Sequence, residues 1–285
     1  MYPTLINVPQ FQALRASGQP LMVFDCSFEL MQPAAGDEQY LQHHIAGAVR
    51  ANLDHHLCAH AGDTAVCAGR HPLPARETFA AWLSRVGFRA DMQAVVYDRQ
   101  GVNYAGRLWW MLKWAGHEAV AVLDGGWQAW VAAGGTVESG IGPALSPSNF
   151  ALTPARIEWV TTDEIIRQLG RPGQTVVDAR ARPRYLGEVE PIDPVAGHIP
   201  GALNRPFPDN LGSDGCFKPA AQLRLEFETL LSGRDPATVV HHCGSGVSAV
   251  PNVLAMELAG LGRRRLYAGS WSEWCSDPGR PVAKG

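Results

Sequence analysis

Residues 239–248 read Val239-Val240-His241-His242-Cys243-Gly244-Ser245-Gly246-Val247-Ser248. The valines at the start are typical of a buried strand, which runs directly into Cys243. The two glycines predict a tight loop, and the apolar pattern of residues 250–258 predicts a helix. A strand, a loop and a helix in this order indicate an α/β fold with a parallel sheet. The cysteine then lies at the carboxyl end of a strand, where such folds bind ligands.

A related pattern occurs twice along the chain, in the same order. The first copy contains residues 21–25, 44–48, 94–98 and 123–127, and the second contains residues 175–178, 198–202, 238–243 and 267–271. Helical patterns over residues 79–86 and 107–114 lie between the strands of the first copy, and residues 250–258 are the counterpart in the second. Strands that alternate with helices predict an α/β domain with a mostly parallel sheet flanked by helices.

We therefore expect two tandem domains, residues 1–135 and residues 155–285. Residues 136–154 are rich in Gly, Pro and Ser and contain one charge, Glu138, which favours a linker. The length of 285 residues is also typical of two domains.

The composition excludes several classes of protein. A formal net charge of -3 does not favour binding to nucleic acid. No apolar run is long enough to span a bilayer, and residues 1–20 lack the pattern of a signal peptide, so we expect no membrane partner and a cytoplasmic location. Six cysteines are too few for a disulfide scaffold, and each is expected to be buried, catalytic or bound to metal.

The loop at Cys243 favours a reactive thiolate. Its glycines allow several backbone N–H groups to point at one anion, and the start of the next helix adds positive partial charge. Such surroundings lower the pKa of a thiol and activate it as a nucleophile. The alternative is a buried structural cysteine followed by a turn.

Cys243-Gly244-Ser245-Gly246-Val247-Ser248 resembles the active loop of the 3-mercaptopyruvate sulfurtransferases of the rhodanese family. The resemblance extends over nearly the whole chain, including both His-Ile-x-Gly-Ala segments and Val-Val-Asp-Ala-Arg at residues 176–180. It implies two rhodanese-like domains, of which only the second is catalytic, because Asp98 stands where the first would have its cysteine. It also implies that Cys243 carries sulfur as a persulfide, with no cofactor.

The same resemblance assigns roles around the nucleophile. The active loop would comprise Gly244, Gly246, Val247 and Ser248. The substrate would be polarised by three side chains that act one on the next, namely Asp54, His71 and Ser245. The match of Asp54 and His71 is loose, because the segment between them is longer than in the family. A surface loop rich in histidine is the alternative for these two residues.

Arg184 resembles a substrate-binding arginine of the family, and a guanidinium suits the carboxylate of mercaptopyruvate. The family has a second arginine shortly afterwards, but residues 188–193 contain none. Thiosulfate remains the alternative donor, although the basic residues that usually follow the cysteine in thiosulfate-type loops are missing. The resemblance implies an acceptor that is a thiol, thioredoxin or cyanide, and the sequence does not choose among the three.

The sequence disfavours other functions. A cysteine phosphatase would need an arginine six residues after the cysteine, where this chain has Ala249. The histidines and cysteines of residues 55–71 lack a close Cys-x-x-Cys pair, so we expect no metal site. A non-catalytic rhodanese-like binding protein is the remaining alternative, which the complete cysteine loop disfavours.

Overall fold

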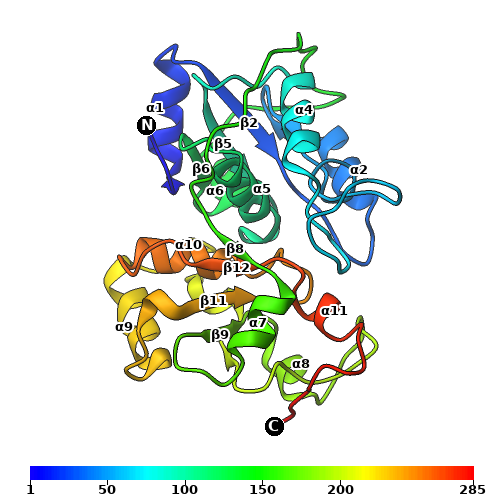
Figure 1. The fold of residues 1–285 in the computed structure, drawn as a ribbon. Coiled ribbons are helices and arrows are strands. Elements are labelled where there is room, and N and C mark those ends of the chain that lie inside the picture. Colours follow the sequence, from blue (N-terminus) through cyan, green and yellow to red (C-terminus); the bar gives the residue numbers. More distant parts are fainter. The chain divides into compact units, whose positions relative to one another are not determined.

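The computed structural model describes residues 1–285, which form two compact units (Figure 1). The first unit comprises residues 1–64, 74–156 and 213–216, and the second comprises residues 65–73, 157–212 and 217–285. None of the helices combines the length and the apolar character that a membrane span requires.

The first unit contains seven strands, of which five form the main sheet and two, β3 and β7, form a small antiparallel sheet. Its elements are β1 (Leu5–Ile6), α1 (Val8–Ala16), β2 (Leu21–Asp25), α2 (Ala35–Gln42), β3 (His44–Ile45), β4 (Val49–Arg50), α3 (Leu53–His56), α4 (Arg76–Arg85), β5 (Gln93–Tyr97), α5 (Asn103–Trp114), β6 (Val120–Leu123), α6 (Gly126–Ala132) and β7 (Val137–Glu138).

The second unit repeats the main elements. They are β8 (Trp159–Val160), α7 (Thr162–Gln168), β9 (Thr175–Asp178), α8 (Arg182–Leu186), β10 (Leu203–Asn204), the 3₁₀ helices η1 (Phe207–Asn210) and η2 (Pro236–Thr238), α9 (Ala220–Leu231), β11 (Val239–His242), α10 (Val250–Leu258), β12 (Arg265–Tyr267) and α11 (Ser270–Trp274).

Both units have a five-stranded parallel sheet with the same topology. The order is β1-β6-β5-β2-β4 in the first unit and β8-β12-β11-β9-β10 in the second. Every strand pair within these two sheets is parallel. The predicted fold class, two tandem α/β domains with parallel sheets, is confirmed.

The central strand of each sheet is the one whose end the sequence analysis singled out. Every residue of β5 and of β11 is buried, because helices cover both faces of the sheet. In the second unit, Val240 packs with Trp271 of α11 on one face, while Val239 packs with Phe227 of α9 on the other. Sheets covered on both faces are typical of all-parallel arrangements.

The two compact units do not follow the order of the chain strictly. Residues 65–73, within the predicted first domain, cluster with the second unit, and residues 213–216, within the predicted second domain, cluster with the first unit. The predicted linker, residues 136–154, clusters with the first unit, and its strand β7 pairs antiparallel with β3. The assignment of residues 136–154 as an interdomain linker stays a prediction.

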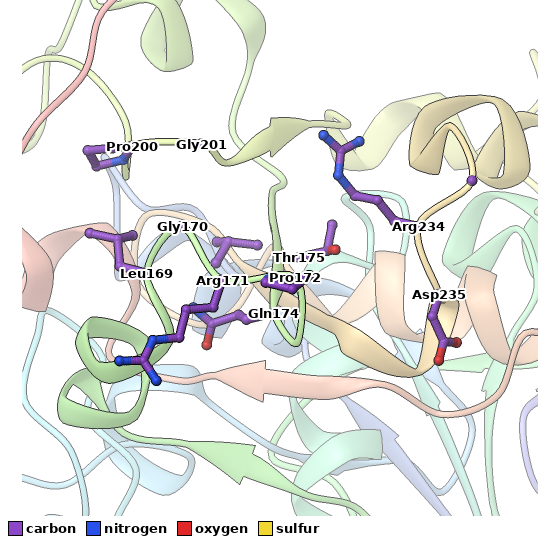
Figure 2. A pocket seen from close by; sticks show the side chains of 12 residues that line it. Leu169, Gly170, Arg171, Pro172, Gln174, Thr175, Pro200, Gly201, Arg234 and Asp235 are labelled. Carbon is purple, nitrogen blue, oxygen red and sulfur yellow. The ribbon is translucent and has the colours of Figure 1, made fainter.

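A cavity of about 510 Å³ lies at the amino-terminal ends of the strands of the second unit (Figure 2). Its lining includes Thr175, which begins β9, and Arg234 and Asp235, which precede β11. Cys243 follows the carboxyl end of β11, so this cavity lies at the opposite end of the strand.

Candidate active site

Cys243 directly follows β11, the central strand of the second sheet, and its side chain is buried. Residues 243–249 form the loop that leads into α10. Gly246 has a φ of +75°, and a Cβ at this position would overlap the carbonyl oxygen of Ala268. A residue with a side chain is therefore excluded at Gly246, and the loop follows a path that only glycine permits.

The first residues of α11 fix the backbone at Cys243. The N–H of Cys243 donates to Oγ of Ser270 over 3.1 Å. The N–H of Trp271 donates to the carbonyl oxygen of Cys243 over 3.0 Å, and that of Ser272 donates to the oxygen of Gly244 over 2.8 Å. The N–H group and the carbonyl oxygen of Cys243 thus both have hydrogen-bond partners, so the loop backbone has little freedom to move.

The corresponding loop of the first unit holds a carboxylate. Asp98 follows β5 and is buried, and its Oδ1 accepts hydrogen bonds of 3.0 Å from the N–H groups of Gln100 and Val102. Its Oδ2 accepts hydrogen bonds of 2.8 Å from the N–H groups of Tyr104 and Ala105. Burial raises the pKa of Asp98, while these four N–H groups act in the opposite direction. The loop is therefore a cradle for one negative group.

The second unit has N–H groups at the same offsets from Cys243. Those of Ser245, Val247 and Ala249 take part in no hydrogen bond of the structure, although all three residues are buried. The fourth, that of Val250, donates to the carbonyl oxygen of Val247. Buried N–H groups almost always have an acceptor. Three such groups next to Cys243 can therefore bind an anion that is bonded to this residue.

His71 and Ser245 lie in contact. Nδ1 of His71 is 2.7 Å from Oγ of Ser245, and both side chains are buried. His71 belongs to residues 65–73, which cluster with the second unit. One unit thus brings together two of the three residues that were predicted to polarise the substrate.

Asp54, the third, lies in α3 of the first unit and is half-buried. Burial raises its pKa, and the neighbouring imidazoles of His55 and His60 act in the opposite direction. The role of Asp54 stays a prediction.

Arg184 lies beside the loop and is held by two carboxylates. Its Nη2 is 2.6 Å from Oε1 of Glu190 and 3.1 Å from Oδ2 of Asp193. Nη1 lies 3.7 Å from the position that a Cβ on Gly244 would occupy. Residues 188–193 lack the second arginine that the family resemblance led us to expect. They instead supply the two carboxylates that pair with Arg184.

A second guanidinium, which the sequence analysis did not assign to the site, lies near the same loop. Nη2 of Arg70 is 3.0 Å from the Cβ position of Gly244, closer than Arg184. The one signal in the sequence was that Arg70 directly precedes His71, which the resemblance had already brought to the site.

His241 and His242, at the end of β11, directly precede Cys243 and are buried. Burial lowers the pKa of His241 to about 3 and also lowers that of His242. Nε2 of His242 lies 3.6 Å from Oδ2 of Asp178, which also pairs with Arg180 at 2.6 Å. These groups stabilise the strand end.

Three further cysteines lie in surroundings that raise the pKa of the thiol. Burial raises the pKa of Cys26, of Cys275 and of Cys216, the last to about 11. Raised values keep these thiols protonated and poorly nucleophilic at neutral pH. No group of three or more metal-ligating side chains is placed to hold a metal ion.

The structure contains two α/β units with one topology. The second unit has a buried cysteine in a loop lined by N–H groups. This combination is typical of one class of protein. The rhodanese-like domain model matches residues 8–133 and residues 161–277. The chain therefore belongs to the rhodanese family.

Its relatives give the class of reaction. The chain is 47% identical over 274 residues to the "Probable 3-mercaptopyruvate sulfurtransferase" of Pseudomonas aeruginosa, covering 96% of this chain and 95% of the relative. It is 39% identical over 287 residues to the "Putative thiosulfate sulfurtransferase SseB" of Mycobacterium tuberculosis, covering 99% and 97%. The 3-mercaptopyruvate sulfurtransferase from Leishmania major has a solved structure with a TM-score of 0.80 and 30% identity, covering 95% of this chain and 74% of that one. The chain is thus a sulfurtransferase, as the sequence predicted.

The cradle of the first unit can be tested through stability. Replacing Asp98 by alanine leaves four buried N–H groups without an acceptor. We expect Asp98→Ala to lower the free energy of unfolding of the first unit by about 3 kcal/mol, since unpaired buried donors are costly. Urea denaturation followed by tryptophan fluorescence measures this change.

Asp91→Ala is the matched control, because Asp91 is exposed and pairs only with Arg89 on the surface. Its unfolding midpoint should equal that of the unchanged protein. An Asp98→Ala variant as stable as this control would show that the four hydrogen bonds contribute nothing.

Proposed function

We propose that the chain transfers sulfur from 3-mercaptopyruvate, through a persulfide on Cys243, to a thiol, thioredoxin or cyanide. The observation that carries this proposal is the set of buried N–H groups of Ser245, Val247 and Ala249, which lack an acceptor beside Cys243. The equivalent groups of the first unit bind the carboxylate of Asp98. A persulfide on Cys243 would carry its negative charge on the outer sulfur, the kind of charge that such a cradle stabilises.

The first half-reaction begins with attack of the Cys243 thiolate on the sulfur of mercaptopyruvate. The new S–S bond forms as the C–S bond of the donor breaks, and the electron pair of that bond leaves as the enolate of pyruvate. The proton of the donor thiol ends on this enolate, so the products are pyruvate and a Cys243 persulfide anion. The thiolate thereby splits the transfer into two easier steps.

In this proposal, Ser245 and His71 assist the departing enolate. The 2.7 Å contact allows His71 to orient the hydroxyl of Ser245. That hydroxyl can then donate to the keto oxygen of the donor as negative charge develops there. The role that the sequence assigned to Asp54 in this series stays a prediction.

The charges near the loop favour a donor with one full charge. The guanidinium groups of Arg70 and Arg184 are balanced by the carboxylates of Asp193 and Glu190, which pair with them. The net charge of these four groups is close to zero, so a dianion such as thiosulfate gains little, whereas a single carboxylate needs only hydrogen-bond donors. Thiosulfate is the second candidate because the relative from M. tuberculosis is named for it.

In the second half-reaction, the thiolate or cyanide acceptor attacks the outer sulfur of the persulfide. The S–S bond breaks, and its electron pair restores the Cys243 thiolate. A thiol acceptor becomes a persulfide and cyanide becomes thiocyanate. Cys243 is thereby ready for another donor.

The persulfide can be detected by intact mass. After incubation with mercaptopyruvate, we expect the mass of the protein to rise by one sulfur atom and to return when a thiol is added. Cys243→Ser should show neither the mass increase nor turnover, because a serine hydroxyl cannot form a persulfide. Cys216→Ser is the control and should behave like the unchanged protein, since Cys216 has a raised pKa. Turnover by Cys243→Ser would refute the persulfide mechanism.

Donor choice can be measured by steady-state kinetics. We expect a higher kcat/KM for mercaptopyruvate than for thiosulfate, for the charge reason given above. Arg184→Ala should lower kcat/KM for mercaptopyruvate by about 2 to 4 kcal/mol in transition-state free energy, as loss of a charge-assisted partner does.

Arg182→Ala is the matched control for the donor measurements, because Arg182 lies on the same helix and is exposed. Its kinetics should equal those of the unchanged protein. A preference for thiosulfate would overturn the choice of donor, and an Arg184→Ala variant with unchanged kinetics would place the anion pocket elsewhere.

A further inference from the structure

Residues 187–197 form a loop whose two ends meet, and we call it the acidic loop. It follows α8 and begins at Gly187, which has a φ of +76°, and it ends at Gly197, which has a φ of +130°. A Cβ on Gly187 would lie 3.3 Å from Cα of Gly197. A surface segment with its ends this close is an Ω-loop, a kind of loop that is frequently functional.

The acidic loop holds the carboxylates that pair with Arg184. Nη2 of Arg184 lies 2.6 Å from Oε1 of Glu190 and 3.1 Å from Oδ2 of Asp193. The same Oε1 accepts hydrogen bonds of 3.1 Å from the N–H groups of Ile192 and Asp193, so the loop also binds itself together. A movement of this loop would therefore move the partners of Arg184.

A separate segment, residues 282–285, lies across the two ends of the acidic loop, and we call it the strap (Figure 1). Ala283 and His198 form an antiparallel bridge in which each N–H donates to the carbonyl oxygen of the other over 2.9 Å. The N–H of Gly285 donates to the carbonyl oxygen of Leu186 over 3.1 Å. The strap thus joins the residue before the loop to the residue after it, and all of these residues belong to the second unit.

The glycines at the ends of the acidic loop make room for the strap. A Cβ on Gly197 would overlap the carbonyl oxygen of Ala283, and a Cβ on Gly187 would lie 2.9 Å from Cγ of Lys284. Both glycines also have a positive φ, which residues with a side chain rarely adopt. The backbone of the loop ends is therefore shaped to fit the strap.

Few contacts hold the strap in place. Val282, Lys284 and Gly285 are exposed, and Ala283 is half-buried. The residue before the strap, Pro281, is anchored separately, because its carbonyl oxygen accepts a hydrogen bond of 2.9 Å from Nε1 of Trp274. Exposed segments with few buried contacts open at a low cost in free energy. The strap can therefore open while the core of the unit stays folded.

We propose that the strap is a clasp, which holds the acidic loop closed and thereby keeps Arg184 oriented for the anionic donor. When the strap is docked, Glu190 and Asp193 restrain the guanidinium group. When it is released, the loop opens and this restraint is lost. Binding of the donor then costs more entropy, while the chemistry at Cys243 is unchanged. The residues of the strap are positioning residues, and the inference rests on the proposed function but names a segment that the reaction class does not assign.

Hydrogen exchange followed by mass spectrometry tests the clasp itself. Two variants release the strap, namely a deletion of residues 282–285 and Ala283→Pro, which lacks the N–H that bonds to His198. In both variants the amides of residues 187–197 should exchange about tenfold faster, while those of residues 243–250 should not change. Ala283→Ser keeps the N–H and is the matched control, so its exchange should equal that of the unchanged protein.

Steady-state kinetics test the link between the strap and the donor. Both strap variants should raise KM for mercaptopyruvate about fivefold and change kcat by less than about twofold, because the contact of Arg184 is present in the ground state and in the transition state. The rate at which a thiol removes sulfur from the preformed persulfide should not change. A general loss of structure would lower kcat and this rate together.

Three outcomes would overturn the inference. Unchanged exchange at residues 187–197 in both strap variants would show that the strap does not hold the loop. Faster exchange with an unchanged KM would show that the loop does not control the donor, and a fall in kcat together with the thiol step would assign the strap a general structural role. If the unchanged protein does not use mercaptopyruvate, the proposed donor fails. Hydrogen exchange still decides whether the strap is a clasp, and KM for thiosulfate then tests its link to the donor.

Discussion

Buried backbone N–H groups are costly without an acceptor. Both units have such groups in the loop that follows the central strand of the sheet. In the first unit, the chain supplies the acceptor itself, because Asp98 receives four such hydrogen bonds. In the second unit, Cys243 takes the same place, and three N–H groups are left without a partner. The first loop therefore holds a carboxylate of its own chain, and we propose that the second binds an anion that forms on its cysteine.

Charged side chains lie in pairs around the loop at Cys243. Asp178, Glu190 and Asp193 together bind Arg180, Arg184 and Arg70. These six groups form equal numbers of positive and negative charges, so the region holds directed donors without a large excess of positive charge. Such an arrangement favours a ligand that fits the geometry of the donors over one that merely carries more charge. The arginines are rigid because each has a carboxylate partner, which reduces the entropy lost on binding.

Features with a local signal could be predicted from the sequence. The repeated strands, the loop at Cys243 and the helix at residues 250–258, which is α10, follow from apolar runs and glycines that are adjacent in the chain. The helix expected at residues 79–86 begins earlier, at Arg76, because its first turn is polar and exposed and adds nothing to the apolar pattern.

Features that depend on long-range packing could not be predicted from composition and spacing. His71 and Ser245 are separated by 174 residues, and only the family resemblance suggested that they act together. Arg70 was missed because its position depends on the docking of residues 65–73 onto Ser272, which no local pattern announces. The sequence showed that residues 188–193 lack the expected arginine. It did not show that Asp193 would bind Arg70, which comes from the other half of the sequence.

A crystal structure of the protein after incubation with a sulfur donor would show whether the loop binds the negative charge of a persulfide. We expect additional density for one sulfur atom on Cys243, within hydrogen-bond distance of the N–H groups of Ser245, Val247 and Ala249. An outer sulfur that points away from these groups, or a second anion that occupies the cradle while the persulfide lies elsewhere, would show that the loop does not bind the persulfide.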